Sequence, residues 1–187
     1  MNLGTILSVL VFTILLMGCV ETGVVKENFA GLVVATKTSG CKVNGLYPDF
    51  ECTPGHVFPR QTLLVNGKGS NSSVIVGDIC EVGYTKSVRA VSAKTKEKVY
   101  EMYGITLREP YQYEIDHLIS LELGGDNDIS NLFPEAYAGS CGARRKDVVE
   151  NLLHKKVCAG EMSLEQAQYD ISRNWTKYAE GCEWNPG

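Results

Sequence analysis

The chain has 187 residues, of which 44% are hydrophobic and 21% charged, and its 18 Lys and Arg nearly balance its 22 Asp and Glu. This composition excludes a disordered or collagen-like chain, and the length is sufficient for one domain with a real core. The formal net charge of −4 excludes a histone-like protein that binds nucleic acid through overall positive charge. Any action on nucleic acid must therefore come from a local site, with a metal ion supplying positive charge.

Residues 1–18 predict an export signal. They contain no Asp, Glu, Lys or Arg, and the apolar run Thr5–Met17 is too short to cross a bilayer comfortably. The run ends in Leu16-Met17-Gly18-Cys19, which resembles a bacterial lipobox, Leu-x-Gly-Cys. The resemblance implies lipidation of Cys19 and an exported, membrane-anchored lipoprotein on the periplasmic or cell-surface side. A plain signal or membrane anchor with a chance cysteine is the alternative.

We expect residues 19–39 to form a tether with one short strand at Gly31–Ala35. We expect residues 40–187 to form the folded domain. The segment 41–69 is rich in Gly, Pro and Asn, so we expect irregular structure there. Six cysteines follow the lipobox, and an even number in an exported chain predicts up to three disulfides among 15 possible pairings. The absence of a Cys-x-x-Cys pair argues against a structural zinc site. The six are Cys41, Cys52, Cys80, Cys141, Cys158 and Cys182.

The middle of the chain predicts one helix and two extended segments. Thr95–Tyr103 has helical apolar spacing and is followed by Gly104, a plausible C-terminal cap. Tyr113–Leu123 is strand-like and ends at a Gly-Gly turn, and Leu132-Phe133-Pro134 forms a second, short extended segment.

Two helices are predicted to close the chain, over Ala143–Val157 and Leu164–Ala179. The second begins after Ser163, which has Gln166 three residues on in a capping-box arrangement. On a helical wheel, the first helix has one apolar side formed by Val148, Val149, Leu152, Leu153 and Val157. Its opposite side is formed by Asp147, Glu150, Asn151 and His154.

The chemically informative segment begins with Asp116-His117 at the end of a predicted strand. Asp offers a hard oxygen ligand for ions such as Mg²⁺, and neutral His can accept a proton from water near physiological pH. The pair is followed by Glu-Leu-Gly-Gly and then by Asn131-Leu, 14 residues after the histidine. This arrangement resembles the HNH endonucleases, in which two strands and a helix surround one divalent ion.

Further segments resemble one exported bacterial HNH family. Together they cover roughly Cys41 to Trp175. They include the segment Cys80–Arg89, Asp49-x-x-Cys52-Thr-Pro-Gly55 and the run from Lys146 to Gly160. Ser120 and Ala90 stand where that family usually has proline. The resemblance implies an α+β fold with a ββα-metal core, additional helices and a cysteine-rich N-terminal segment.

Position by position, the resemblance implies that His117 is the general base and that Asp116 binds the metal. Asn131 corresponds to the central Asn, which braces the loop that aims the imidazole. The helix ligand is open: Asn151 comes first, with His154, Glu150 and Asp147 behind it. Arg144, Arg145 and Lys146 begin that helix and could bind phosphate, although a solvated helix end is the plainer interpretation.

We therefore expect an exported, monomeric endonuclease that hydrolyses phosphodiester bonds, most readily in DNA and without sequence preference. The expected cofactor is a divalent ion, Mg²⁺ first, with Mn²⁺, Ni²⁺ or Zn²⁺ as alternatives. A lipid at Cys19 would hold the protein at a membrane. The alternative is a catalytically inactive envelope lipoprotein that binds nucleic acid or protein.

Overall fold

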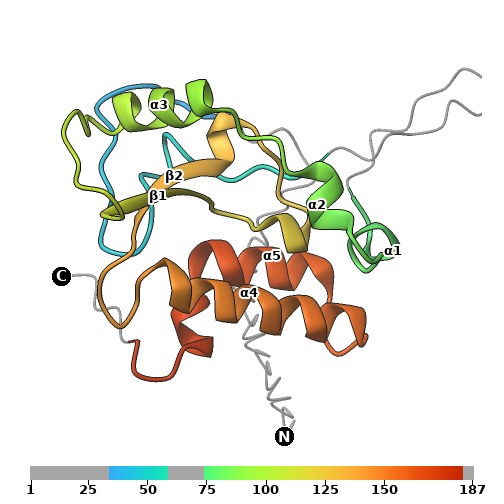
Figure 1. Cartoon of the computed structure of the whole chain (residues 1–187). Helices are drawn as coiled ribbons and strands as arrows, with labels where there is room; N and C mark the ends of the chain where they lie inside the picture. Colours follow the sequence, from blue (N-terminus) through green and yellow to red (C-terminus); the bar gives the residue numbers. More distant parts are fainter. Residues whose placement is uncertain (1–33, 59–73, 183–187) are drawn as a thin grey trace, which may run out of the picture.

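The structure is a computed structural model that describes residues 34–58 and 74–182. The predicted signal, Cys19 and most of the predicted strand at 31–35 lie outside these residues. Figure 1 shows the order of the elements along the chain. They are α1 Val76–Ile79, α2 Tyr84–Val88, α3 Ala93–Met102, β1 Tyr113–His117, η1 Leu121–Leu123, η2 Ile129–Asn131, β2 Leu132–Ala136, α4 Ala143–Cys158, α5 Leu164–Arg173 and η3 Trp175–Tyr178, where η marks a 3-10 helix. This mixed content confirms the predicted α+β class.

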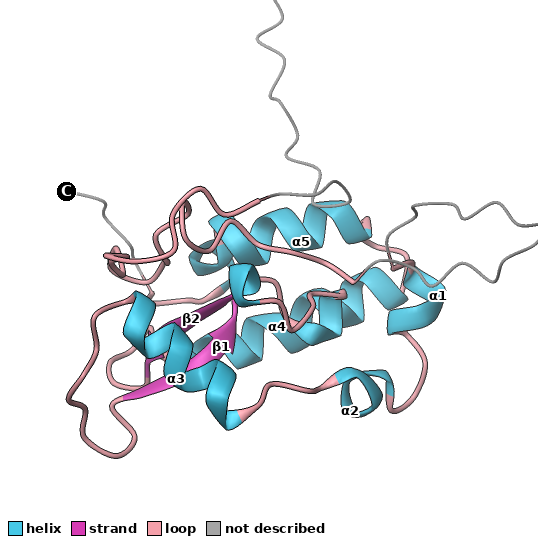
Figure 2. Ribbon diagram, turned by 90° about the horizontal axis from the view of Figure 1, so that it is seen from above, coloured by secondary structure: helices cyan, strands magenta, loops and turns pink. Residues whose placement is uncertain are grey.

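A two-stranded antiparallel sheet stands at the centre of the fold. In its register Asp116 of β1 lies opposite Phe133 of β2, and His117 lies opposite Leu132. Helix α3 covers one side of this hairpin, and α4 and α5 lie on the other side (Figures 1 and 2). The C-terminal end of β1 therefore faces the N-terminal half of α4, where Lys146 contacts Asp116 and His117.

Two apolar clusters hold these layers together. The larger one joins α4, α5, η1 and η3, and its fully buried members include Leu123, Leu153, Ile171 and Trp175. The smaller one joins α3 to the hairpin and to the segment around Cys41 and Cys52. Burial of these side chains is the main stabilising contribution to the layered arrangement.

Three disulfides crosslink the fold: Cys41–Cys52 closes a local loop, and Cys80–Cys158 and Cys141–Cys182 join segments that are distant in the chain. The expectation of crosslinked cysteines is thus confirmed, and the pairing that the sequence left open is resolved. Three disulfides indicate an oxidising, exported environment. Among the described residues, no helix has the length and apolarity needed to span a bilayer.

The predicted helices and the second extended segment are present, with small differences at their ends. Helix α4 covers 143–158, and Ser163 caps α5 by accepting a hydrogen bond from the Gln166 backbone N–H at 3.2 Å. The predicted continuous helix to Ala179 is wrong, because the chain leaves helical geometry at Asn174 and continues as the short η3. Val148 and Leu152, both predicted on the packing side of α4, are 58% and 37% exposed, so the buried side is narrower than the helical wheel suggests.

The predicted strand Tyr113–Leu123 is also too long, because β1 ends at His117. The apolar residues that follow, Leu118, Ile119, Leu121 and Leu123, are buried in a turn and a 3-10 segment rather than in a sheet. Two short helices, α1 and α2, were not expected from the sequence.

Candidate functional site

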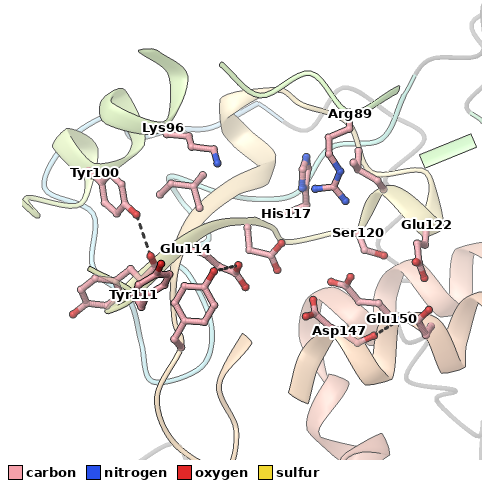
Figure 3. A pocket seen from close by; sticks show the side chains of 16 residues that line it. Arg89, Lys96, Tyr100, Tyr111, Glu114, His117, Ser120, Glu122, Asp147 and Glu150 are labelled. Atoms are coloured by element: carbon pink, nitrogen blue, oxygen red, sulfur yellow. Dashed lines mark hydrogen bonds between the residues drawn. The ribbon is translucent and has the colours of Figure 1, made fainter. Parts of the chain in front are cut away.

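A polar cavity of about 570 Å³ opens at the end of β1, between the hairpin, the α2–α3 segment and α4. Figure 3 shows that His117 lies near the middle of the lining, close to Arg89, with Asp147 and Glu150 of α4 below them. Its lining brings Asp116 and His117 together with side chains from the polar side of α4, as the sequence predicts. The lining residues are Arg89, Lys96, Tyr100, Tyr111, Tyr113, Glu114, Ile115, Asp116, His117, Ser120, Leu121, Glu122, Tyr137, Asp147, Glu150 and Asn151.

Lys146 of α4 fixes the end of β1 against the helix. Its ammonium group donates to Asp116 Oδ2 at 2.6 Å, to the His117 carbonyl at 2.9 Å and to Glu150 Oε1 at 2.6 Å. Glu135 of β2 lies within 3.9 Å of the same nitrogen. Lys146 is 1% exposed, so its three N–H groups are directed into the protein and it does not present a free charge to a phosphate. Its predicted phosphate-binding role is therefore replaced by a structural one.

Burial and the Lys146 ammonium act in opposite directions on the pKa of each carboxyl group in this cluster. Burial opposes ionisation of Asp116, but the Lys146 ammonium outweighs it and lowers the pKa of Asp116 to about 2. Burial raises the pKa of Glu150 to about 7, against the effect of Lys146 and with the help of the Asp116 charge. Burial likewise raises the pKa of Glu135 well above its usual value. Asp116 is thus ionised at neutral pH, as a metal ligand must be.

Asn127 determines which nitrogen of His117 can act as a base. The Asn127 side chain donates through Nδ2 to the Val88 carbonyl at 2.7 Å and accepts through Oδ1 from the Ala90 N–H at 3.3 Å. These two bonds identify Oδ1 as the acceptor that faces His117 Nε2, 3.2 Å away. Nε2 must then carry the proton in the neutral ring, which leaves the lone pair on Nδ1.

The His117 ring is also kept neutral. It is 4% exposed, and burial lowers its pKa, although the neighbouring Asp116 carboxylate and the Asn127 contact act in the opposite direction. A neutral imidazole with a free Nδ1 can accept a proton from a water molecule in the cavity. Asn127 was not identified from the sequence, since nothing in the run Asp126-Asn127-Asp128 distinguishes it from an ordinary polar turn.

Asn131 braces the loop that links the two strands. Its side chain accepts from the Ile119 N–H at 3.0 Å and donates to the carbonyls of Ile119 and Asp126 at 3.0 and 2.9 Å. The side chain is fully buried, so these bonds replace those that the backbone groups would make with water. The contacts agree with the bracing role that the resemblance implies.

The Gly-Gly pair in the same loop has a steric basis. Gly124 ends η1 with φ of +79°, a conformation that favours glycine. At Gly125 an added Cβ would lie 1.7 Å from the Ile119 carbonyl oxygen and 2.9 Å from Asn131 Nδ2. The backbone therefore passes too close to the Asn131 brace for any side chain.

The other predicted site residues divide into two groups. Asn151 lines the cavity and donates Nδ2 to the Asp147 carbonyl at 2.8 Å. His154 does not line it: its Nε2 lies 3.0 Å from the Ile79 carbonyl and 3.4 Å from Cys158 Sγ. Arg144 and Arg145 also lie outside the lining, and Arg145 donates to the Glu180 carbonyl at 2.7 Å.

The cavity is lined by oxygen donors of the type that hard divalent cations bind, but among the described residues three His, Cys, Asp or Glu ligand atoms come within 4.8 Å of one another only at Cys80, His154 and Cys158. Five carboxyl groups line it, and two buried oxygens, Ser120 Oγ and Glu122 Oε2, have no hydrogen-bond partner among the described residues. Buried polar atoms without partners are unusual and indicate an absent ligand or water. Mg²⁺ needs only one or two carboxylates, because it keeps several waters. Neither Ser120 nor Glu122 is predicted from the sequence to be a site residue: Ser120 stands out only because it replaces a proline, and Glu122 only as part of the Glu-Leu-Gly-Gly run. The five carboxyl groups belong to Glu114, Asp116, Glu122, Asp147 and Glu150.

A second group could bind a metal ion, away from this cavity. One ligand atom from each of Cys80, His154 and Cys158 lies within 4.8 Å of the other two. The two cysteines form a disulfide in the structure, and a metal binds the thiolate form of cysteine. This group could therefore hold an ion only after reduction of the disulfide.

No family model matches the chain, and neither the curated proteins nor the solved structures contain a match. The cavity and its side chains are accordingly the basis for assigning a function.

Proposed function

We propose that the chain is a metal-dependent endonuclease that hydrolyses phosphodiester bonds of nucleic acid, with His117 as the general base. The observation that supports this proposal most strongly is the His117–Asn127 contact, which leaves Nδ1 of a neutral imidazole free beside the ionised Asp116. A strand, a strand and a helix in that order surround the pair. This arrangement is the one expected of the ββα-metal core of an HNH endonuclease.

The cavity offers a place for each part of the reaction. His117 takes the proton from the attacking water, and Asn127 holds the ring in the required tautomer. Arg89 and Lys96 line the same cavity and are suited to contact phosphate oxygens. Asp116 and Asn151 would hold the ion, with Asp147, Glu150 and Glu122 within the same lining. When bound, the ion would stabilise the charge that develops on the phosphoryl group and the leaving oxygen.

The test is cleavage of supercoiled plasmid by purified protein in Mg²⁺, Mn²⁺, Ni²⁺ and Zn²⁺, with EDTA as the blank. We expect His117→Ala to lower the nicking rate at least about 100-fold, because a positioned general base contributes at least that factor. His154→Ala removes a histidine that does not line the cavity and should retain activity. Equal cleavage by His117→Ala and the parent protein would refute the base assignment.

One observation favours a second candidate, a binding module without catalysis. The Lys146 ammonium already neutralises Asp116 through a 2.6 Å contact, which would lower the affinity of this carboxylate for a divalent ion. DNA binding without turnover in any of the four ions would favour this candidate. In both candidates, lipidation of Cys19 remains a prediction from the first 19 residues.

A further inference from the structure

The end of the cavity away from Glu122 and Glu150 is aromatic. Four tyrosines line it, which we call the tyrosine end: Tyr100, Tyr111, Tyr113 and Tyr137. In Figure 3, Tyr100 and Tyr111 lie on the side opposite Arg89 and Glu122, with His117 between them. The proposed chemistry uses none of these rings, so their concentration on one wall requires a separate explanation.

Most of these rings are held in position by specific contacts. The Tyr100 hydroxyl donates to the Tyr113 carbonyl at 3.4 Å, and the Arg108 guanidinium lies 3.8 Å from the Tyr100 ring centre. The Tyr137 hydroxyl donates to Glu114 Oε2 at 2.7 Å. Tyr111 packs edge-on against Tyr137, with ring centres 6.4 Å apart. The tyrosine end is therefore held in place by contacts within the protein itself.

Tyr111 differs from the other three residues of the tyrosine end in its exposure and its backbone conformation. Its side chain is 85% exposed, and its φ of 62° lies in the left-handed region, where it is the one non-glycine residue among those described. A β-carbon in that region is strained, and folding gains little from an aromatic ring left in water. Strained backbone of this kind clusters at ligand-binding sites. A second hollow of about 400 Å³ also has Tyr111 and Tyr113 in its lining, so Tyr111 stands between two concave surfaces.

A nucleic-acid strand matches this combination of features. It alternates anionic phosphates with flat bases, and the cavity has Arg89, Lys96 and the proposed hydrolytic residues together with aromatic rings. Of these rings, Tyr111 is open to a base, whereas Tyr100 is buried and covered by Arg108. Base stacking on aromatic side chains is strong and tolerant of sequence. In a duplex the bases are stacked and paired inside the helix, so an unpaired strand is the form that can reach such rings.

We infer that the tyrosine end is a stacking subsite for unpaired nucleobases next to the scissile phosphate, which makes single-stranded nucleic acid the preferred substrate. This inference rests on the proposed function for the position of the scissile phosphate. The subsite itself concerns binding and can be tested without cleavage. Because stacking does not read the edges of bases, the preference should be for unpaired strands of any sequence.

The experiment measures fluorescence anisotropy of labelled DNA with the His117→Ala protein in Mg²⁺, and a denaturing gel confirms that the DNA stays intact. The ligands are a single strand, the matching duplex and the same single strand with abasic sites. We expect the intact single strand to bind about tenfold more tightly than the other two. Adding Tyr111→Ala should remove that advantage, whereas Tyr111→Phe should retain it, because the ring is the element that stacks. Val82→Ala is the control, since this apolar side chain is fully exposed and lines neither the main cavity nor the second hollow.

Equal affinity for intact and abasic strands, no change with Tyr111→Ala, or no measurable binding of the single strand would overturn the subsite. Circular dichroism confirms that each variant is folded. The two proposals fail in different ways. Plasmid nicking that requires His117, combined with indifference to abasic sites, would remove the subsite and keep the nuclease. Tyrosine-dependent binding without any cleavage by the parent protein would do the reverse.

Discussion

The ammonium group of Lys146 is 1% exposed and touches two carboxylates and one backbone carbonyl, each within 2.9 Å. These contacts join α4 to the last two residues of β1 and so set the distance between the helix and the Asp116-His117 pair. They also keep the pKa of Asp116 low. One buried side chain therefore contributes to the packing and to the charge of the cavity.

We predict that Lys146→Met destabilises the protein by about 3–5 kcal/mol, because it leaves buried carboxylates without their cation. The measurement is urea-induced unfolding at pH 7.5. Arg145→Met provides the comparison, since Arg145 is less buried and its hydrogen bond within the described residues is a single one, to the Glu180 carbonyl at 2.7 Å. A difference of less than 1 kcal/mol between the two variants would show that the buried cluster has little energetic importance.

Tyr103 links α3 to the cysteine-rich segment through its hydroxyl, which lies 2.8 Å from Thr53 Oγ1. Burial raises the pKa of Tyr103 to about 12, against the opposing effect of the Thr53 contact. Between pH 10 and 12 the folded chain retains the phenolic proton and the unfolded chain loses it. Stability from this group is therefore fully present below pH 10 and decreases as the pH rises towards 12.

Tyr103→Phe should cost about 1 kcal/mol at neutral pH, because the hydrogen bond to Thr53 is lost. Above pH 10 the difference between the variant and the parent should shrink, since the phenylalanine has no proton to lose. Thermal melts at several pH values from 8 to 11 measure both effects. A difference that stays constant or widens with pH would contradict the assigned pKa.

At the scale of elements, the connection between β1 and β2 determines where His117 points. Asn131 hydrogen-bonds to Ile119 and Asp126, and Gly125 lies so close to Ile119 and to the Asn131 side chain that an added Cβ would overlap both. The connection is consequently tight, although it contains no regular strand. Its form explains why a Gly-Gly pair and an Asn occur together in the sequence.

Gly125→Ala should destabilise the protein by at least about 2 kcal/mol, because its Cβ has no space beside the Ile119 carbonyl. Gly77→Ala is the matched control: in the short helix α1 the new Cβ would meet only Ile75 Cδ1, at an ordinary distance of 3.8 Å. The melting temperatures of the two variants measure the contrast. If both variants melt alike, the close approach at Gly125 is not a constraint.

Local patterns predicted some elements well and others poorly, for a physical reason. Helix α4 and strand β2 follow their own periodicity and turn signals, and both are present close to the predicted limits. The run after His117 is apolar enough for a strand, yet its backbone bonds to Asn131 and it turns away from the sheet. Tertiary hydrogen bonds of this kind leave no periodic signal in the sequence.

At the scale of the whole molecule, the candidate site likewise combines residues that local sequence patterns identify with residues that only tertiary contacts bring together. Asp116 and His117 were recognisable as neighbours in the chain, and the polar side of α4 provided Asp147, Glu150 and Asn151. The role of Asn127 and the burial of Lys146 depend on segments far apart in sequence, so spacing alone could not predict them. The disulfide pairing has the same cause, since it follows from which elements pack together.

The disulfide between Cys80 and Cys158 has a consequence for resistance to proteolysis. It closes a covalent ring of the intervening chain, and every residue that lines the main cavity, from Arg89 to Asn151, belongs to that ring. A protease that cuts one exposed loop there opens the ring without detaching either piece. The two pieces stay covalently linked through the disulfide, so the side chains that line the cavity can stay packed together after a single cut.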